Sequence, residues 1–569
     1  MSDTPNLNKR KKILKSRSRS ATLLAIYYFV VLIIPNCILA TTEHYSIWST
    51  EALILLPLGF YMIWSVVLRR SGIMIWLGFV FIFFAAFQIV LLYLFGNSII
   101  ATDMFTNLLT TNPGEAGELL GNIYPAVLIV AVLYLPLLWF AMREIAHRRY
   151  LSRTARTNIG LLGSVVFSLG LLLLYPAYHV SEDRHVVRDE IFPVNVFYNL
   201  RVCAQEFRKT YNFENTSKDF TYNASQSVKT SKREIYVYVI GEASRAMNWQ
   251  LYGYERETNP CLSQVPDLIV FKDMLTQSNT THKSVPLMLS SVATNQHNEL
   301  FKRSGLPALF NEVGFETWFI SNQSAQGAMI DKLAHDARHV IYIPAPRDDC
   351  QMLDEIQRAV ESSKSQKMLF ILHCYGSHFS YHQRYPDDFA HFVPDDDVAI
   401  SSANVEMIRN AYDNSIRYTD YFLAQTIHYL NGLDACSALL YCSDHGEDIL
   451  DDRRGRFLHA SPTTTAYQLY VASVAWFSAD YQQEFPKKIE AAKIHADTPT
   501  NTRTLFHTMA DIASIQGDYV DFGASLVSEK FDTKTPRYYL NDHNEAVPYV
   551  KTGLSQGDLE VFRKFGVNL

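Results

Sequence analysis

Apolar residues are concentrated in long runs within the first 178 positions, whereas the rest of the 569-residue chain alternates short apolar runs with polar segments. A helix needs about 20 mostly apolar residues to cross a membrane. Five stretches meet this requirement, at approximately 21–40, 52–68, 73–95, 124–142 and 159–178. The pattern therefore predicts a five-span transmembrane domain over residues 21–178, preceded by a basic tail over residues 1–20.

Basic side chains mark every second loop of this region. All fourteen Lys and Arg residues before position 178 lie in the N-terminal tail or in the loops after the second and fourth spans. The alternate loops, 41–51 and 96–123, contain none. Lys and Arg are retained on the cytoplasmic side, so the tail is predicted to be cytoplasmic and everything after the fifth span to be outside. A cleaved signal peptide is the alternative for the first run, but that run is too long and four further spans follow.

A polar connector and a second, differently patterned domain follow the spans. Residues 179–232 are the predicted connector, and its amphipathic part, 192–207, is expected to lie along the membrane surface. Short apolar runs separated by helical segments begin at residue 233, which predicts an α/β domain over 233–569 with a largely parallel sheet. The candidate strands are 235–240, 317–321, 368–373, 438–443 and 471–476.

Composition and charge narrow the possible classes. Apolar residues make up 48% of the chain and charged residues 19%, which excludes a disordered or collagen-like protein. The net charge is −6 overall but −13 beyond residue 178, so the basic surface needed to bind nucleic acid is missing. The seven cysteines lack the spacing of a disulfide framework or a zinc ribbon. An exported domain can still oxidise one or two pairs, and Cys436 and Cys442 are the nearest in sequence.

Three of the predicted strands end in side chains that can bind a metal ion. Glu242 follows the first, His373 and His378 end or follow the third, and the fourth leads into Asp444, His445 and Glu447. Each motif alone is typical of a turn. Because ligands collect at the carboxyl ends of parallel strands, the three together predict one site. Carboxylate oxygens with an imidazole suit Zn²⁺ or Mn²⁺ acting as a Lewis acid.

Two threonines are candidates for a nucleophile. Thr280 and Thr281 precede the helix-like segment 285–292, and a helix N-terminus can hold a phosphate group. The alternative is that both are simply helix-capping residues.

In order along the chain, the motifs resemble those of the phosphoethanolamine transferases, inner-membrane enzymes of Gram-negative bacteria that modify lipopolysaccharide. They are Gly241-Glu242-Ala-Ser-Arg245, Gly253-Tyr-Glu-Arg-Glu-Thr-Asn-Pro260, Thr-x-x-Ser-Val-Pro from Thr281, Gly376-Ser-His378, Ser443-Asp444-His445-Gly446-Glu447 and Leu458-His459. The resemblance covers the whole chain. It implies five spans followed by a periplasmic domain of the sulfatase and alkaline-phosphatase fold.

The same resemblance implies roles for particular residues. Glu242, Asp444 and His445 match the ligands of a catalytic zinc, and Thr281 matches both the nucleophile and the fourth ligand. His378 and His459 match histidines that contact the transferred phosphate or a second metal and assist proton transfer, and Glu447 matches an accessory metal position.

Three residues in the loop after the third span match a substrate-binding set of the family. Asn107, Thr111 and Glu115 have the spacing of residues that hold the ethanolamine end of the donor. A local alternative is that residues 112–115 are a capping box with Pro113 at the first helical position.

Departures from the family pattern bear on the acceptor. Members that modify lipid A carry a disulfide around the nucleophile, at positions occupied here by Gln277 and Leu287, and many have a lysine where this chain has Gln326. In both respects the chain resembles the disulfide-poor members of the family, which modify the lipopolysaccharide core or periplasmic glucans.

The predicted reaction transfers phosphoethanolamine from phosphatidylethanolamine to a lipopolysaccharide or periplasmic glucan acceptor through a phosphorylated threonine. The expected partners are this donor, that acceptor and membrane lipids, with no nucleic acid. Three alternatives remain: a phosphoglycerol transferase of the lipoteichoic-acid synthase type, a sulfatase, and a catalytically inactive membrane sensor or scaffold. The sulfatase is disfavoured because Lys283 stands near Thr281 without the arginine that a sulfatase motif requires.

Overall fold

The computed structural model divides the chain into two compact units. It describes residues 4–43, 45–96, 98–110, 113–180, 185–325, 327–345 and 348–569. The helical unit comprises Met1–Thr102, Leu119–Val202 and Asp452–Arg456, and the sheet unit comprises Asp103–Glu118, Cys203–Asp451 and Phe457–Leu569. The division between Val202 and Cys203 lies inside the predicted connector, residues 179–232.

Long apolar helices make up the helical unit. Within the described residues, four helical stretches are long and apolar enough to cross a membrane, and a fifth candidate is a pair bent by 60°. The helices are α1 (Thr4–Leu32), α2 (Ile34–Thr42), α3 (Ile47–Val66), the bent pair α4 (Ser71–Leu77) and α5 (Phe79–Phe95), α7 (Pro113–Ala146), α8 (Arg153–Val180), α9 (Val186–Asp189) and α10 (Val194–Tyr211). The first residues of α7, up to Glu118, and the last residues of α10, from Cys203, belong to the sheet unit. The five predicted spans correspond to these helices, with the third as the bent pair.

Small residues bring α3 and α8 together. A Cβ atom on Gly59 would lie 2.4 Å from the backbone nitrogen of Phe167, and one on Gly163 would lie 2.8 Å from Met62 Cβ. Close backbone approach at glycine is a common basis for helix association in membranes. The amphipathic segment of the connector is helical from Val194 onward, where it forms the first part of α10.

A seven-stranded sheet forms the centre of the sheet unit. Its strand order is β3-β11-β8-β2-β7-β5-β6. Strands β8, β2, β7, β5 and β6 are parallel, whereas β11 runs antiparallel to both β8 and β3. The strands are β3 (Ile269–Val270), β11 (Ser473–Phe477), β8 (Ala435–Ser443), β2 (Arg233–Gly241), β7 (Lys367–His373), β5 (Glu316–Ser321) and β6 (His339–Tyr342). All five predicted strands are therefore present in one largely parallel sheet.

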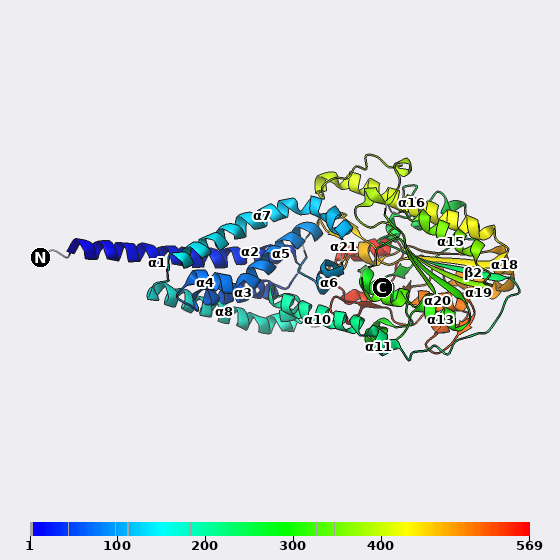
Figure 1. Cartoon of the computed structure of the whole chain (residues 1–569), viewed down its shortest axis with the longest axis horizontal. Coiled ribbons are helices and arrows are strands. Elements are labelled where there is room, and N and C mark those ends of the chain that lie inside the picture. The colour runs from blue at the N-terminus through cyan, green and yellow to red at the C-terminus, as the bar shows by residue number, and fades with distance from the viewer. Residues whose placement is uncertain are drawn as a thin grey trace. The chain divides into compact units, whose positions relative to one another are not determined.

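The central strands read as continuous apolar runs because helices cover both faces of the sheet. Every residue of β8 is buried, as are all but the first of β2. Helices α15 and α16 lie on one side of the sheet, and α13, α19 and α20 lie on the other (Figure 1). The helices of this unit are α6 (Thr102–Thr110), α11 (Phe213–Ser217), α12 (Thr281–Met288), α13 (Leu306–Glu312), α14 (Met329–Ala334), α15 (Cys350–Ser362), α16 (Val405–Asn431), α17 (Ala466–Leu469), α18 (Ala479–Glu484), α19 (Pro486–His495), α20 (Thr504–Ile512) and α21 (Gln556–Lys564).

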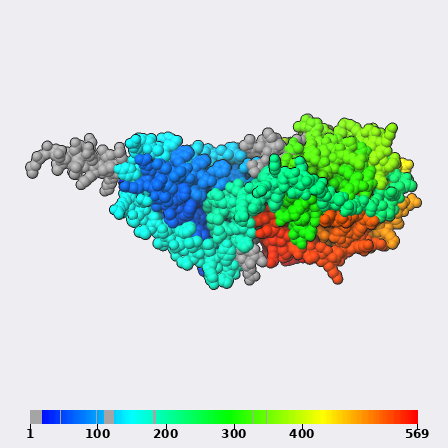
Figure 2. All heavy atoms as spheres, turned by 60° about the horizontal axis from the view of Figure 1, so that its bottom comes forward, coloured from blue at the N-terminus to red at the C-terminus, as the bar shows by residue number. Residues whose placement is uncertain are grey.

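The C-terminal residues pack beside much earlier parts of the same unit. The backbone N–H of Leu540 donates to the carbonyl of Gln277 at 2.7 Å, and Figure 2 shows the C-terminal residues in red against green residues of this unit. Short strand pairs complete the unit: β1 (Ser225–Gln226) with β13 (Ile515–Gln516), β4 (Met274–Leu275) with β12 (Thr500–Asn501), β9 (Asp448–Ile449) with β10 (Phe457–Leu458), and β14 (Tyr538–Leu540) with β15 (Ala546–Pro548).

All seven cysteines are described, and all are free thiols in the structure. Cys436 and Cys442, the nearest pair in sequence, lie on the same strand β8.

Candidate active site

Three neighbouring strands bring the candidate side chains to one edge of the sheet. Gly241, the last residue of β2, pairs with Ser443, the last residue of β8, and Ile240 pairs with His373 at the end of β7. Because the three strands are adjacent and parallel, the residues that follow them converge. This register places Glu242 next to Asp444 and His445, which are far away in sequence.

Glu242, Asp444 and His445 form a cluster that could hold a metal ion. One ligand atom from each lies within 4.8 Å of the others, and all three residues are fully buried. Asp444 Oδ1 accepts hydrogen bonds from the backbone N–H groups of Ala243 at 3.2 Å and His445 at 2.7 Å. Asp444 Oδ2 lies 3.3 Å from His445 Nε2 and accepts no hydrogen bond within the described part of the chain.

The hydrogen bonds of His445 fix which ring nitrogen faces the cluster. Its Nδ1 lies 2.9 Å from the carbonyl oxygen of Gly446, so Nδ1 carries the proton and donates. Nε2 is then an acceptor that points at Glu242 Oε1 at 3.3 Å and at Thr281 Oγ1 at 3.1 Å. A nitrogen lone pair beside two carboxylates is an arrangement that a cation would stabilise.

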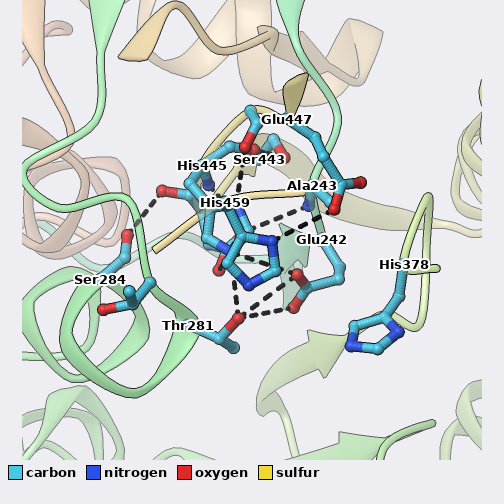
Figure 3. Close-up of polar contacts among 12 residues, drawn as sticks. Glu242, Ala243, Thr281, Ser284, His378, Ser443, His445, Glu447 and His459 are labelled. Carbon is cyan, nitrogen blue, oxygen red and sulfur yellow. Dashed lines mark hydrogen bonds and ion pairs between the residues drawn. The ribbon is translucent and has the colours of Figure 1, made fainter. Parts of the chain in front are cut away.

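Thr281 is the first residue of α12, and its hydroxyl points into the same cluster (Figure 3). Its Oγ1 lies 3.2 Å and 3.3 Å from the two carboxylate oxygens of Glu242. Ser284, one turn later, donates to the carbonyl of Asp444 at 2.6 Å and so ties α12 to the end of β8.

Thr280 has a different environment. It is the N-cap residue of α12, but its side chain makes no capping hydrogen bond, and its hydroxyl lies 3.5 Å from Ser278 Oγ. The two threonines are therefore distinguished by geometry, since the Thr281 hydroxyl contacts the acidic cluster.

Burial strongly shifts the ionisation of the cluster. Desolvation raises the pKa of Glu242 to about 8 and the pKa of Asp444 to about 8. Desolvation also lowers the pKa of His445 to about 4, so its imidazole is neutral at pH 7. Buried carboxyl groups of this kind need a proton or a cation, and a divalent ion would replace the protons while retaining neutral imidazole as a ligand.

Glu447 and His459 form a second pair beside the cluster. His459 Nδ1 lies 3.2 Å from Glu447 Oε1, and the rings of His459 and His445 have centroids 4.1 Å apart. Desolvation raises the pKa of Glu447 to about 8 and lowers the pKa of His459 to about 4. The pair extends the site beyond the three metal-binding candidates.

His378 comes from a separate loop, after β7. Its Nδ1 donates to the carbonyl of Phe379, which leaves Nε2 as an acceptor, and Figure 3 draws no contact from it to the cluster. Desolvation lowers the pKa of His378 to about 3, with His459 and His445 among the smaller causes, so all three imidazoles share one electrostatic environment.

A glycine brings the His378 loop against Glu242. Gly376 has φ +49°, and a Cβ atom there would lie 2.8 Å from the carbonyl oxygen of Glu242. The buried carboxylate of Asp349 accepts from the backbone N–H groups of Tyr375 and Gly376 at 2.9 Å and 3.0 Å. Asn322 donates to the same carboxylate at 2.6 Å. The loop is thus held from its other side.

Gln323 is a site residue that the sequence did not indicate. Its amide donates to Glu242 Oε2 and to the carbonyl of Cys374, each at 2.9 Å. Its place after the predicted strand at 317–321 is the one signal in the sequence, but Gln323 reaches Glu242 only because β5 lies next to β7 in the sheet. His373 is different: its Nδ1 contacts Ser321 Oγ at 3.1 Å, and it takes no part in the cluster.

Of the three predicted ethanolamine-binding residues, the structure describes only the backbone of two. Thr111 falls outside the described residues, as does Gln326. Asn107 lies on α6 and Glu115 on α7, and their side chains are also outside the described part. Helix α7 begins at Pro113, as the capping alternative requires.

Two family models match the chain. Residues 56–206 match the family described as phosphoethanolamine transferase EptA/EptB, and residues 234–515 match the sulfatase family. Among characterised proteins, the Kdo(2)-lipid A phosphoethanolamine 7''-transferase of Escherichia coli K12 is 28% identical over 421 residues, which cover 68% of this chain and 72% of that protein. The phosphatidylethanolamine transferase Mcr-1 of Escherichia coli is 28% identical over 445 residues, covering 72% and 79%.

Solved structures resemble both the whole chain and its sheet unit. The integral membrane lipooligosaccharide phosphoethanolamine transferase A of Neisseria meningitidis has a TM-score of 0.72 at 21% identity, covering 90% of this chain and 98% of that one. The C-terminal periplasmic domain of EptC from Escherichia coli, solved in complex with Zn, has a TM-score of 0.53 at 25% identity and covers 59% of this chain and 97% of that domain.

Proposed function

Because the chain belongs to the phosphoethanolamine transferase family, we propose that it transfers phosphoethanolamine from phosphatidylethanolamine to a lipopolysaccharide or periplasmic glucan acceptor. The observation that carries the proposal is the position of Thr281. Its Oγ1 is within 3.3 Å of both Glu242 and His445, where a nucleophile beside a metal site is needed. A threonine serving only as a cap would not require this contact.

We assign a bound Zn²⁺ to Glu242, Asp444, His445 and the Thr281 oxygen. The chemistry of this donor set fits the ion, because two carboxylates, a neutral imidazole and an alcohol oxygen converge in a buried site. When bound, Zn²⁺ lowers the pKa of a coordinated hydroxyl and offsets negative charge on a phosphate. Mn²⁺ has the same preference for oxygen and imidazole ligands.

In the first step, Thr281 Oγ attacks the phosphorus of the donor lipid. The new Oγ–P bond forms as the bond from phosphorus to the diacylglycerol oxygen breaks. The Thr281 hydroxyl gives up one proton and the departing oxygen gains one, so that diacylglycerol leaves as an alcohol. The position of Thr281 at the start of an eight-residue helix adds backbone N–H groups that favour a phosphate.

In the second step, an acceptor oxygen attacks the phosphothreonine and Thr281 is regenerated. His378 and His459 are assigned to accept the proton that the acceptor loses, because a histidine ring nitrogen is the most common proton acceptor in such steps. The Nδ1 of His378 is engaged with the carbonyl of Phe379, which leaves Nε2 for this transfer. Asn107, Thr111 and Glu115 are assigned to the ethanolamine end of the donor, where a carboxylate would hold the ammonium group.

We place the helical unit in the inner membrane and the sheet unit in the periplasm, because all fourteen basic residues before position 178 lie in loops on one side. Both the donor and a glycolipid acceptor are then membrane components.

Mass spectrometry of lipopolysaccharide and periplasmic glucans tests the acceptor. Cells that express the protein should carry phosphoethanolamine on one of these molecules, and cells without it should not. We expect the modification on the lipopolysaccharide core or on glucans, since Gln277 and Leu287 stand where lipid A-modifying members have a disulfide. Identical spectra with and without the protein would contradict the proposal, and glycerophosphate in place of phosphoethanolamine on the cellular acceptor would identify a phosphoglycerol transferase instead.

Replacing Gln323 with leucine should weaken metal binding. The substitution removes the amide that donates to Glu242 at 2.9 Å, while keeping a similar volume. Residues that orient a metal ligand typically contribute about 10–100-fold to affinity, so a loss of this size is expected in a zinc competition titration. Gln366→Leu, on an exposed position before β7, is the matched control and should retain wild-type affinity. Equal affinities for the two variants would show that Gln323 does not orient Glu242.

A further inference from the structure

A buried ion pair connects α6 to the helix that begins with Thr281. Lys283 Nζ lies 2.9 Å from Asp103 Oδ1, and the two side chains are only 6% and 4% exposed. The neighbouring residue His282 places Nε2 3.1 Å from the same carboxylate oxygen. Asp103 and these two residues all belong to the sheet unit.

The C-terminal part of the chain completes this contact. Lys283 Nζ also donates to the carbonyl oxygens of Asn541 at 3.1 Å and Asp542 at 3.2 Å. The backbone N–H of Asp103 donates to Asp542 Oδ1 at 3.2 Å. The lysine therefore has three oxygen acceptors, and α6, α12 and the turn after β14 meet at one ammonium group.

General stability is a poor explanation for such an arrangement. Removing a carboxylate and an ammonium group from water is costly, and well-packed apolar residues can often replace a buried ion pair without loss of stability. What a buried pair adds is register, because its hydrogen bonds are satisfied in only one relative position of the segments that carry it.

The pair fixes the relative position of two segments, one near the residue that attacks the phosphate and one near a residue assigned to the ethanolamine group. Lys283 is two residues from Thr281, the proposed nucleophile. Asp103 is four residues, about one helical turn, from Asn107, which the proposed function assigns to the ethanolamine end. Holding α6 against α12 therefore holds the helix that carries Asn107 at a fixed distance from the atom that attacks phosphorus.

We propose that Asp103 and Lys283 are positioning residues that lock α6 to the nucleophile helix and thereby align the ethanolamine headgroup with Thr281. This inference rests on the proposed function and adds a source of headgroup specificity. Neither residue contacts the Glu242, Asp444 and His445 cluster through a recorded hydrogen bond, and both act through the segments that they connect.

The test uses Asp103→Asn and Lys283→Met in the full-length, detergent-purified protein. Loading of Thr281 is followed by intact mass with two lipid donors, phosphatidylethanolamine and phosphatidylglycerol. Misplacement of a bound group by about 1 Å can cost on the order of 100-fold in rate, so loading from phosphatidylethanolamine should fall about 10–100-fold. Loading from phosphatidylglycerol should change little, because that headgroup has no ammonium to align. The ratio of the loading rate with phosphatidylethanolamine to that with phosphatidylglycerol is thus expected to fall by the same factor.

Two further measurements separate positioning from folding. Lys302→Met, which removes an exposed ion pair with Glu299, is the matched control and should leave headgroup preference unchanged. Hydrogen–deuterium exchange should become faster at the amides of α6 in Asp103→Asn, whereas the central strand β2 stays protected.

The outcomes are distinct. Wild-type preference together with unchanged exchange in α6 would overturn the inference, as would an equal loss with both donors in proportion to a lowered melting temperature. A wild-type protein that loads Thr281 from neither donor would contradict the proposed function itself, a result that no property of the Asp103 and Lys283 variants could produce.

Discussion

Replacing Thr281 with alanine is expected to abolish phosphoethanolamine transfer while leaving the protein folded. The substitution removes the oxygen that lies within 3.3 Å of Glu242 and His445, and with it the only atom to which phosphorus is proposed to bind. Loss of a covalent nucleophile lowers turnover by about 1,000-fold or more. The measurement is intact-mass detection of the phosphoethanolamine adduct, combined with mass spectrometry of the cellular acceptors.

Two neighbouring substitutions make this result specific. Thr281→Ser retains a hydroxyl at the same position and should form the adduct. Thr280→Ala removes a hydroxyl whose nearest recorded partner is Ser278 Oγ at 3.5 Å, so transfer should persist. Unchanged modification of the acceptor by Thr281→Ala would refute the assignment of Thr281 as the nucleophile. An adduct on Thr280 would identify Thr280 as the nucleophile instead.

The sheet could be predicted because its central strands are buried on both faces. Such strands must be continuously apolar, and the runs at β2, β7 and β8 are therefore visible in the sequence. The polar residues directly after these strands share one edge of the sheet, which is why Glu242, Asp444 and His445 could be grouped without a structure. The apolar segment 285–292 indicated a helix close to Thr281, but α12 begins four residues earlier than that segment, at Thr281, and ends at Met288.

Contacts between distant segments could not be predicted in this way. Asp103 and Lys283 are 180 positions apart, and nothing in the local pattern of either indicates the other. Gln323 likewise looks like an ordinary polar residue after a strand, and its bond to Glu242 depends on the order β2-β7-β5 in the sheet. The antiparallel direction of β11 could not be predicted from the sequence either, because an apolar run indicates a buried strand but not the direction in which it runs.

Removing the metal is expected to abolish activity and to make the stability of the protein depend strongly on pH. Without a cation, Glu242, Asp444 and Glu447 have pKa values raised to about 8, and the largest cause is desolvation. Their ordinary pKa values are near 4 in an unfolded chain. Between about pH 4 and pH 8 the folded state therefore binds more protons than the unfolded state, so the free energy of unfolding falls as pH rises.

The imidazoles act in the opposite direction, but over a lower pH range. Desolvation lowers the pKa of His445 to about 4, so the unfolded state binds the extra proton between about pH 4 and 6.5. This contribution increases stability with pH and is complete near pH 6.5. From pH 6.5 to 8 the carboxyl groups dominate, and the metal-free protein should become steadily less stable.

Zinc should therefore raise the melting temperature more at pH 8 than at pH 6.5. At pH 6.5 the ion must displace protons from the buried carboxyl groups, whereas at pH 8 fewer remain to be displaced. At about 100 times its dissociation constant, a ligand stabilises the folded state by about 2.7 kcal/mol, a change that a thermal scan detects. The experiment compares chelator-treated protein with and without added Zn²⁺ at both pH values, and it monitors proton release in weakly buffered solution.

Asp444→Asn is the decisive variant for this prediction. It removes one charge from the cluster while keeping the acceptor that binds the backbone N–H groups of Ala243 and His445. The variant should lose transfer activity, respond little to zinc and release fewer protons. Asp388→Asn, at an exposed position, is the matched control and should behave as the wild type. If the chelated wild-type protein keeps full activity, or if zinc stabilises Asp444→Asn as much as the wild type, then Glu242, Asp444 and His445 are not the metal site.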